Sequence, residues 1–443
     1  MDNDTIVAIA TAHGIGSIAI IRLSGDKALS IAKKLSRKQD FSPRYATLTT
    51  VFDKEEQLID ETIIIYFKNP HSFTGEDVVE IQCHGGYIVA QSILQTCLDA
   101  GARVANAGEF SKRAFFNGRI DLSEAEAISQ LIEAKSEDAA KILAKQIKGS
   151  LKEFIEEVRD EIIHILAYSE VSIDYAEEDL PEDLIEQIKE KLKRLRAQLE
   201  KTLQASKSRA GLMQGFRVAI VGKPNVGKSS LLNALLNYNR AIVSDIAGTT
   251  RDTIEEQVKI GTHLIRIVDT AGIREASDEI EKIGIERSLE AIEQSDIVVS
   301  VFDNSRELDN EDKQILSLLE KTPKQQISIK NKIDLETKLE LDREFDLELN
   351  SKDDVTPLIQ KLETIMDRSN SSDEIMLISQ RQIAAVEETI KDIDEAFAPL
   401  EDQELEIFSF HLNEAVKAMA SITRPFENDE MLDKMFGSFC LGK

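Results

Sequence analysis

The chain has 443 residues, and this length predicts two to four domains rather than one core. Hydrophobic residues (42%) and charged residues (30%) stand near the averages for globular proteins, no apolar run is long enough to span a bilayer, and three scattered cysteines suit a reducing compartment. We therefore expect a cytoplasmic protein, and the formal net charge of -27 argues against a broad nucleic-acid-binding surface.

The first 118 residues predict an α+β domain. Short β-branched runs at residues 18–23, 62–67 and 78–83 are typical of strands, and residues 89–98 have the period of a helix. Glycine-rich turns separate these segments, which favours a compact sheet with helices packed on it.

The next region has helical periodicity, and it is interrupted. Apolar residues recur at steps of three and four through residues 119–210, and helical periodicity returns over 375–397 and 405–420 within residues 369–443. Polar stretches at 207–211 and 369–373 predict linkers on either side of an alternating strand and helix pattern. We expect one helical domain with an α/β domain, residues 215–368, inserted into it.

The inserted domain begins with a phosphate-binding motif. The hydrophobic strand 216–221 runs into Gly222-Lys-Pro-Asn-Val-Gly-Lys228-Ser229, and a helical run follows. Backbone N–H groups and the helix N-terminus are expected to hold the phosphates, while Lys228 reaches the β and γ phosphates and Ser229 binds Mg²⁺. A chance glycine-rich turn does not explain strand, loop and helix in this order.

Two further segments complete the predicted phosphate site. Thr250, in the polar segment 244–252, is the expected second hydroxyl ligand of Mg²⁺. A strand at 264–268 ends in Asp269-Thr-Ala-Gly272, where a carboxylate can hold the Mg²⁺ shell and the Gly272 N–H can face the γ phosphate.

Guanine specificity is predicted from Asn331-Lys332-Ile-Asp334, because the carboxylate of Asp334 can accept both guanine N1–H and the exocyclic amine. Asn350-Ser-Lys lies where a third base-contacting loop is expected, but a solvated turn explains it almost as well.

The group that orients the attacking water is less evident. Ile273 follows Gly272, where Ras-like enzymes place a glutamine. Glu281, in the polar stretch 275–282, is our candidate for a replacement, and a solvated helix face is the other explanation of this residue.

These motifs, the segment Gly248-Thr-Thr-Arg-Asp252 and the tail Cys440-Leu-Gly-Lys443 together resemble the MnmE (TrmE) family of tRNA-modification GTPases over essentially the whole chain. The resemblance implies a multidomain α/β protein with an N-terminal folate-binding domain, a central helical domain and an inserted Ras-like P-loop GTPase domain. It implies a GTP site made of Asn225, Val226, Gly227, Lys228, Ser229, Ser230, Ser244, Asp245, Ile246, Ala247, Gly248, Thr249, Thr250, Asp269, Thr270, Ala271, Gly272, Asn331, Lys332 and Asp334.

The resemblance also implies ions and a second ligand. In addition to Mg²⁺, K⁺ would be held by Asn225, Ser244, Ile246 and Thr249 in place of an arginine finger, with Glu281 as the catalytic residue that orients water indirectly. A 5-formyl- or methylene-tetrahydrofolate would be bound by Arg22, Glu80, Arg119 and Lys443. Without the resemblance, Arg22 would be an ordinary exposed cation, and Cys440 is more often inert than nucleophilic.

The implied function is GTP hydrolysis coupled to tRNA modification. The chain would form a homodimer through its N-terminal domain and work with MnmG (GidA), which carries FAD, to modify C5 of the wobble uridine with a folate one-carbon unit. The basic run Lys191, Lys193, Arg194 and Arg196 is a local RNA contact or, more commonly, a solvated helix face. The rival hypothesis is a GTP-switched ribosome-assembly factor that modifies nothing, and folate binding would separate the two.

Overall fold

The computed structural model describes residues 4–12, 14–134, 136–174, 184–208, 210–238, 256–268, 289–341, 344–350, 354–368, 375–424, 429–439 and 442. The chain divides into two compact units, Met1–Gln130 with Gln146–Ile188 and Lys391–Lys443, and Leu131–Lys145 with Lys189–Ile390. Among the described residues, none of the helices combines the length and the apolarity that crossing a bilayer requires.

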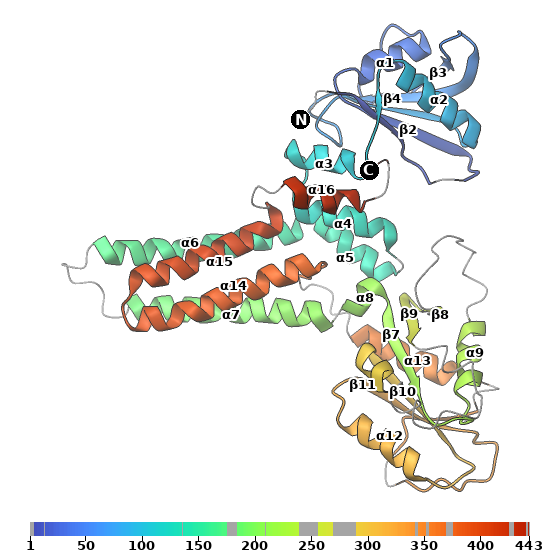
Figure 1. The fold of residues 1–443 in the computed structure, drawn as a ribbon, viewed down its shortest axis with the longest axis vertical. Helices are drawn as coiled ribbons and strands as arrows, with labels where there is room; N and C mark the ends of the chain where they lie inside the picture. Colours follow the sequence, from blue (N-terminus) through green and yellow to red (C-terminus); the bar gives the residue numbers. More distant parts are fainter. Residues whose placement is uncertain are drawn as a thin grey trace. The chain divides into compact units, whose positions relative to one another are not determined.

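The N-terminal part of the first unit is a six-stranded sheet with two helices on one face (Figure 1). In chain order its elements are β1 (Ile6–Ile9), β2 (Ile18–Ser24), α1 (Ala28–Ser36), β3 (Thr47–Phe52), β4 (Leu58–Phe67), β5 (Val78–His84), α2 (Tyr87–Asp99) and β6 (Arg103–Val104). The strand order is β3-β4-β5-β2-β1-β6, with β1 and β6 parallel and the other pairs antiparallel.

The two faces of this sheet differ in exposure. Ile21, Ile64 and Ile81 are fully buried in the core that the sheet forms with α1 and α2. Alternate residues point to the other face, where Ile63 of β4 lies opposite Leu48 of β3, and both are exposed. One sheet face is therefore covered, and the other is left partly open.

The rest of the first unit is helical. It contains α3 (Glu109–Phe116), α4 (Leu122–Glu133, to residue 130), α6 (Ser150–Asp174), the second part of α14 (Gln380–Glu401), α15 (Leu405–Thr423) and α16 (Asp429–Gly437). Figure 1 shows α6 and α15 side by side, and Ser169 and Ser409 share a hydrogen bond of 3.2 Å between these helices. Leu432, Phe436 and Phe439 pack with Leu122, so α16 and the residues just after it lie against α4.

The second unit contains a six-stranded sheet covered on both faces. Its elements are α5 (Glu137–Ile147, to residue 145), α7 (Leu184–Ser208, from residue 189), α8 (Ala210–Gln214), β7 (Phe216–Val221), α9 (Lys228–Tyr238), β8 (Glu256–Ile260), β9 (His263–Val268), β10 (Ile297–Asp303), α12 (Asn310–Glu320), β11 (Gln325–Asn331), β12 (Leu347–Leu349), α13 (Thr356–Arg368) and the first part of α14.

The strand order of this sheet is β12-β11-β10-β7-β9-β8, and the β8–β9 pair alone among these is antiparallel. Leucines of α9 and α13 pack on one face, whereas Ile315 and Leu319 of α12 pack on the other. Helices on both faces of a mostly parallel sheet make a doubly wound α/β domain, as predicted for the inserted region.

The short helix α5 contacts this sheet through the β8–β9 turn. Thr262 donates a hydrogen bond of 2.7 Å to Asp138 at the start of α5, and Lys259 lies 3.6 Å from Glu137. His263 is buried beneath the turn, with its Nε2 2.8 Å from Asp367 of α13. A piece of the predicted helical region therefore packs as part of the α/β unit.

Some predicted boundaries were wrong. The linker expected at 207–211 is helical on both sides of residue 209, because α7 continues to Ser208 and α8 begins at Ala210. Gly211 fits there because Phe216 packs against its Cα, leaving no room for a side chain. The helix expected from residue 375 begins at Gln380 instead, and the strand expected at 62–67 begins four residues earlier. The hinge at 369–373 lies outside the described residues.

Candidate functional site

The P-loop connects the end of β7 to the start of α9 and lies close to the neighbouring strand β10. Gly222 has φ +150°, and a Cβ built on it would lie 2.5 Å from the carbonyl oxygen of Val301 in β10, so only glycine fits. Asn225 has φ 63°, a left-handed conformation that asparagine tolerates better than most residues. The strand, tight loop and helix that the sequence predicts are all present.

The side chain of Lys228 lies over the P-loop, close to the residues at its start. Its Nζ donates hydrogen bonds to the carbonyl oxygens of Gly222 (2.5 Å) and Lys223 (2.7 Å). Burial first, and then the positive charge of Arg306, lower the pKa of the Lys228 ammonium to about 8. An anion beside Lys228 would reverse this shift, which is the electrostatic property expected of a phosphate-binding lysine.

The predicted base-binding loop is joined directly to the P-loop. Asn331 ends β11, is buried, and donates a hydrogen bond of 2.7 Å from Nδ2 to the carbonyl oxygen of Val226. Lys332 has φ 63° and donates from Nζ to Asp303 at 2.6 Å. Asp334 lies exposed in the turn that follows. The structure therefore brings the first and last of these motifs together, although they are about a hundred residues apart.

The loop after β10 contacts both the P-loop and the base motif, and no sequence motif pointed to it. Burial opposes ionisation of Asp303, but hydrogen bonds from Lys332 and Ser305 hold the pKa of this carboxyl below its usual value. At the far end of the loop, Lys223 of the P-loop forms an ion pair with Asp309. Arg306 lies between these two anchor points.

A second group of predicted residues lies on the partly open face of the N-terminal sheet. Arg22 and Glu80 are paired neighbours on β2 and β5, and Arg22 donates from Nε to Glu80 at 2.9 Å. The guanidinium also lies over two aromatic rings, 5.7 Å from the centroid of Phe73 and 5.8 Å from that of Phe110. Both charged side chains keep about a fifth of their surface in solvent, at 23% and 17%.

Arg119 contacts the loop that carries Phe73. Its Nε donates a hydrogen bond of 3.0 Å to the carbonyl oxygen of Ser72, and its side chain packs against Gly75. Because Phe73 of this loop also contacts Arg22, residues 72–75 join the two predicted folate ligands. Near the end of the chain, Gly442 has φ +92° and lies against Ile9 of β1, with no space for a side chain.

An ion-pair network around a buried arginine supports this loop. Arg113, 8% exposed, donates to Asp4 at 2.6 Å and to Glu76 at 3.1 Å. The hydrogen bond from Arg103, opposed by burial and aided by the bond from Arg113, holds the pKa of the Asp4 carboxyl below its ordinary value. Sequence reasoning did not find this network because its members are scattered charged residues without a motif.

Several predicted site residues lie outside the described residues. They are Ser244, Asp245, Ile246, Ala247, Gly248, Thr249, Thr250, Asp269, Thr270, Ala271, Gly272, Glu281, Cys440 and Lys443. Ser351 and Lys352 of the weaker base motif lie outside them as well. Their roles stay predictions.

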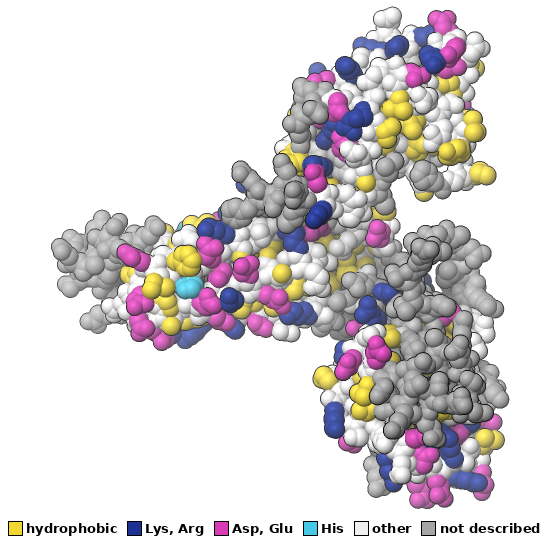
Figure 2. Space-filling view, in the orientation of Figure 1, with side chains coloured by type: hydrophobic (Ala, Val, Ile, Leu, Met, Phe, Trp, Pro, Cys, Tyr) yellow, Lys and Arg dark blue, Asp and Glu magenta, His cyan; other side chains and the backbone are white. Residues whose placement is uncertain are grey.

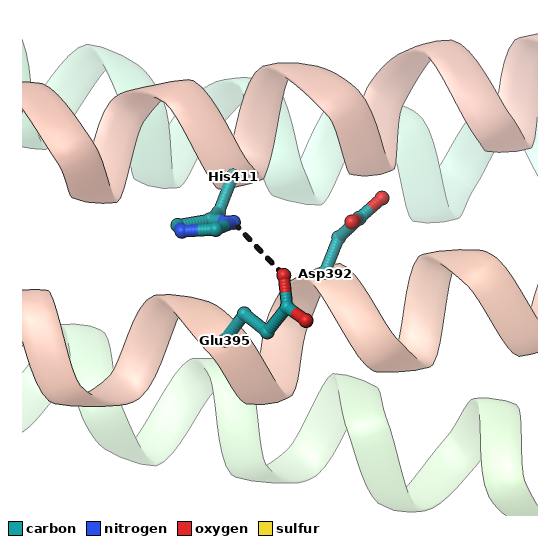
Figure 3. A group of neighbouring side chains, drawn as sticks. All are labelled: Asp392, Glu395 and His411. Atoms are coloured by element: carbon teal, nitrogen blue, oxygen red, sulfur yellow. Dashed lines mark ion pairs between the residues drawn. The ribbon is translucent and has the colours of Figure 1, made fainter.

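Among the described residues, one group of a histidine and two carboxylates has ligand atoms close enough together to hold a metal ion: Asp392 and Glu395 of α14 and His411 of α15 (Figure 3). His411 Nδ1 lies 3.4 Å from Glu395, and this contact joins the two helices. Lys391 lies 3.6 Å from the other oxygen of Glu395, whose side chain is 46% exposed. Lys391 and solvent compete for the Glu395 carboxylate that a metal ion would need. An ion pair between two helices is enough to explain the group, so we assign no metal to it.

The basic run on α7 has the placement of a solvated helix face. Lys193 and Arg194 are exposed, Leu192 and Leu195 between and beside them are buried, and Arg194 lies 3.4 Å from Glu190 one turn earlier. These contacts alone give no reason to place RNA there.

Comparison with known proteins covers the whole chain. The family model for the GTP-binding protein TrmE N-terminus matches residues 5–119, and the model for the MnmE helical domain matches residues 122–440. The tRNA modification GTPases MnmE of Sulfurimonas denitrificans and Aliarcobacter butzleri are 74% and 58% identical to this chain, and each alignment spans 100% of both proteins. A solved structure of Era with MgGDPNP and 16S ribosomal RNA is 25% identical over 40% of this chain and 66% of that one, but its TM-score of 0.26 is too low to support an argument.

The predicted fold class is confirmed, with a TrmE-type N-terminal domain, an MnmE-type helical domain and a P-loop α/β domain. The match of the helical-domain model to residues on both sides of the α/β domain agrees with the predicted insertion. Together with the full-length identity, these matches show that the chain belongs to the MnmE family of tRNA modification GTPases.

Proposed function

We propose that this chain is a K⁺-dependent GTP hydrolase that acts with MnmG (GidA) to modify C5 of the wobble uridine of certain tRNAs to an aminomethyl-type group. A folate one-carbon unit would supply the added carbon, as in carboxymethylaminomethyluridine. The observation that carries this proposal is the Arg22–Glu80 pair, with the Arg22 guanidinium over two aromatic rings, in a chain that also has a P-loop. A GTPase that only switches has no need of such a site.

The proposed GTP site uses groups whose positions suit the task. Lys228 lies at the P-loop carbonyls and can reach the β and γ phosphates, and Ser229 at the start of α9 would hold Mg²⁺ together with Thr250. Asn225 would hold K⁺ together with Ser244, Ile246 and Thr249, and its left-handed backbone sets it at the turn of the loop. Bound Mg²⁺ and K⁺ would supply positive charge to the phosphates as the bond to the γ phosphate breaks. Glu281 would orient the attacking water.

The proposed folate site has complementary chemistry. A carboxylate such as Glu80 can accept hydrogen bonds from the amino groups of a pterin, and guanidinium groups such as Arg119 can bind the carboxylates of a glutamate tail. The contact of Gly442 with β1 brings the chain to the N-terminal sheet one residue before Lys443, which supports the proposal that this lysine serves the same site.

The proposed homodimer would use the partly open sheet face. Ile18 of β2 (60% exposed) and Leu48 of β3 (62%) are on strands of this sheet, and hydrophobic side chains gather on the N-terminal domain in Figure 2. Apolar side chains exposed together favour a protein partner. Replacing Leu48 and Ile63 by Lys should therefore shift the protein toward monomer in sedimentation experiments, whereas an unchanged mass would count against this face.

The first experiment is the initial rate of GTP hydrolysis in matched K⁺ and Na⁺ buffers, with light scattering to follow association of the GTPase domains. We expect a strong preference for K⁺, and equal rates of hydrolysis in both salts would rule out the K⁺ mechanism. Glu281→Ala should bind GTP normally but hydrolyse it slowly. If that variant still supported normal tRNA modification, hydrolysis would not drive the reaction.

Folate binding separates this proposal from a ribosome-assembly factor. Full-length protein should bind 5-formyltetrahydrofolate, and Glu80→Gln should bind it more weakly by about 10-fold or more, because a charged hydrogen bond is lost. Glu61→Gln, an exposed change on β4, is the matched control. Absence of folate binding in the wild-type protein would favour the rival function.

A further inference from the structure

We infer that Arg306 is an additional cationic contact for the β or γ phosphate of the bound nucleotide, supplied in cis by the loop after β10. This inference rests on the proposed placement of GTP on the P-loop. It adds a residue that lies outside every GTP-binding motif of the sequence, between Asp303 and the start of α12.

The loop that carries Arg306 and the strand before it are anchored at three points, two of them on the P-loop and one on the base motif. Its strand, β10, approaches so closely that the carbonyl of Val301 faces Gly222. Asp303 binds Lys332 of the base motif, and Asp309 binds Lys223, which is only 6% exposed. A side chain in the middle of this loop is thereby held beside the phosphate-binding turn.

The guanidinium of Arg306 has N–H donors without acceptors among the described residues. Its Nε and Nη2 are buried, and neither donates a hydrogen bond within the part of the chain that the structure describes. The nearest carboxylate oxygen, on Asp303, lies 3.9 Å from Nε and already accepts a shorter bond from Lys332. Buried donors without acceptors are costly, and two of them on one cation indicate that an anion belongs there.

The positive charge of Arg306 also contributes to the lowered pKa of Lys228. The positive charges of Arg306 and Lys228 repel each other in the free protein, and a polyphosphate bound near them would stabilise both. A brace for Asp303 is the competing explanation, because an arginine beside a carboxylate is common. Asp303, however, has the ammonium of Lys332 and the hydroxyl of Ser305 at 2.7 Å as closer partners.

The test is competition binding of GMP, GDP and GTP to full-length wild type, Arg306→Gln and Arg306→Lys. A phosphate contact predicts that Gln weakens GDP or GTP binding by about 10- to 100-fold while GMP binding changes little, and that Lys recovers part of the loss. Lys313→Gln removes the same charge from an exposed position on α12 and should bind all three like wild type.

Two outcomes would overturn the inference. Equal losses for GMP, GDP and GTP would make Arg306 a brace for the loop, and unchanged affinities would make it irrelevant to the nucleotide. The melting temperature without nucleotide shows whether the variants fold. If the wild-type protein itself failed to bind guanine nucleotides, the proposed function would fail instead, so the two failures are distinguishable.

Discussion

At alkaline pH the protein should take up protons when it binds a nucleotide, because Lys228 becomes protonated in the complex. In the free protein burial and Arg306 bring the pKa of Lys228 to about 8. Phosphate oxygens beside the ammonium favour its charged form, so the pKa rises on binding. Below pH 7 the lysine is charged before and after binding, so no proton is taken up. Above pH 8 the lysine is mostly neutral in the free protein and must gain a proton when the nucleotide binds.

The size of the effect follows from the pKa of about 8. The fraction of neutral Lys228 in the free protein is about 0.1 at pH 7, about 0.5 at pH 8 and about 0.9 at pH 9. Each GDP bound should take up roughly that number of protons, provided that the bound lysine stays charged. Above pH 8 the affinity should fall by up to about tenfold per pH unit from this group.

Isothermal titration calorimetry with GDP and Mg²⁺, in buffers that differ in ionisation enthalpy, measures the proton count directly. The phosphate groups are already ionised above pH about 7 and contribute no protons there, and the proton that guanine N1 takes up at about pH 9 is separated by comparing wild type with Arg306→Gln. Arg306→Gln should move the uptake curve to higher pH, because one cause of the low pKa is removed, and Lys313→Gln should not. A proton count near zero at pH 9 in the wild-type protein would refute this account of Lys228.

Three other substitutions test contacts within the two units, two of them at the predicted sites. Arg113→Leu should lower the free energy of unfolding by about 2 kcal/mol at pH 7, because the charged hydrogen bonds from a buried guanidinium to the partly exposed carboxylates of Asp4 and Glu76 are lost. The pKa of Asp4 is lowered in the folded protein, so its contribution is complete above its unfolded value of about 3.9 and is lost as the pH falls through the folded value. Urea unfolding at pH 7 and at about pH 3.5 should therefore show a smaller effect in acid, and equal effects would contradict the ion-pair explanation. Asn331→Ala should weaken GDP binding by about 1–3 kcal/mol in a fluorescence titration, because the bond that joins the base loop to the P-loop is lost, and unchanged affinity would count against that coupling. Thr262→Val should lower the stability of the α/β unit by about 1–2 kcal/mol through loss of its bond to Asp138, seen as faster hydrogen exchange in the β8–β9 turn, and unchanged exchange would show that α5 is held by other contacts.

The sequence by itself determined the fold class and the family. A hydrophobic strand, a glycine-rich loop and a helix in succession are a local signal, because phosphate binding needs backbone N–H groups at one tight turn. The predicted strand at 216–221 matches β7 residue for residue. Residues 207–211 were misjudged because polar side chains suit exposed helices as well as linkers, and local composition does not say which neighbours will pack.

Only the tertiary structure decided which distant residues meet. Asn331 bonds to Val226 and Arg22 pairs with Glu80 because strands far apart in the chain are neighbours in their sheets, and strand order is a property of the whole fold. Arg306 is an ordinary arginine in the sequence, and its unpartnered buried nitrogens exist only once β10 lies beside the P-loop. Motifs record local geometry, whereas charge and burial depend on what surrounds a side chain in space.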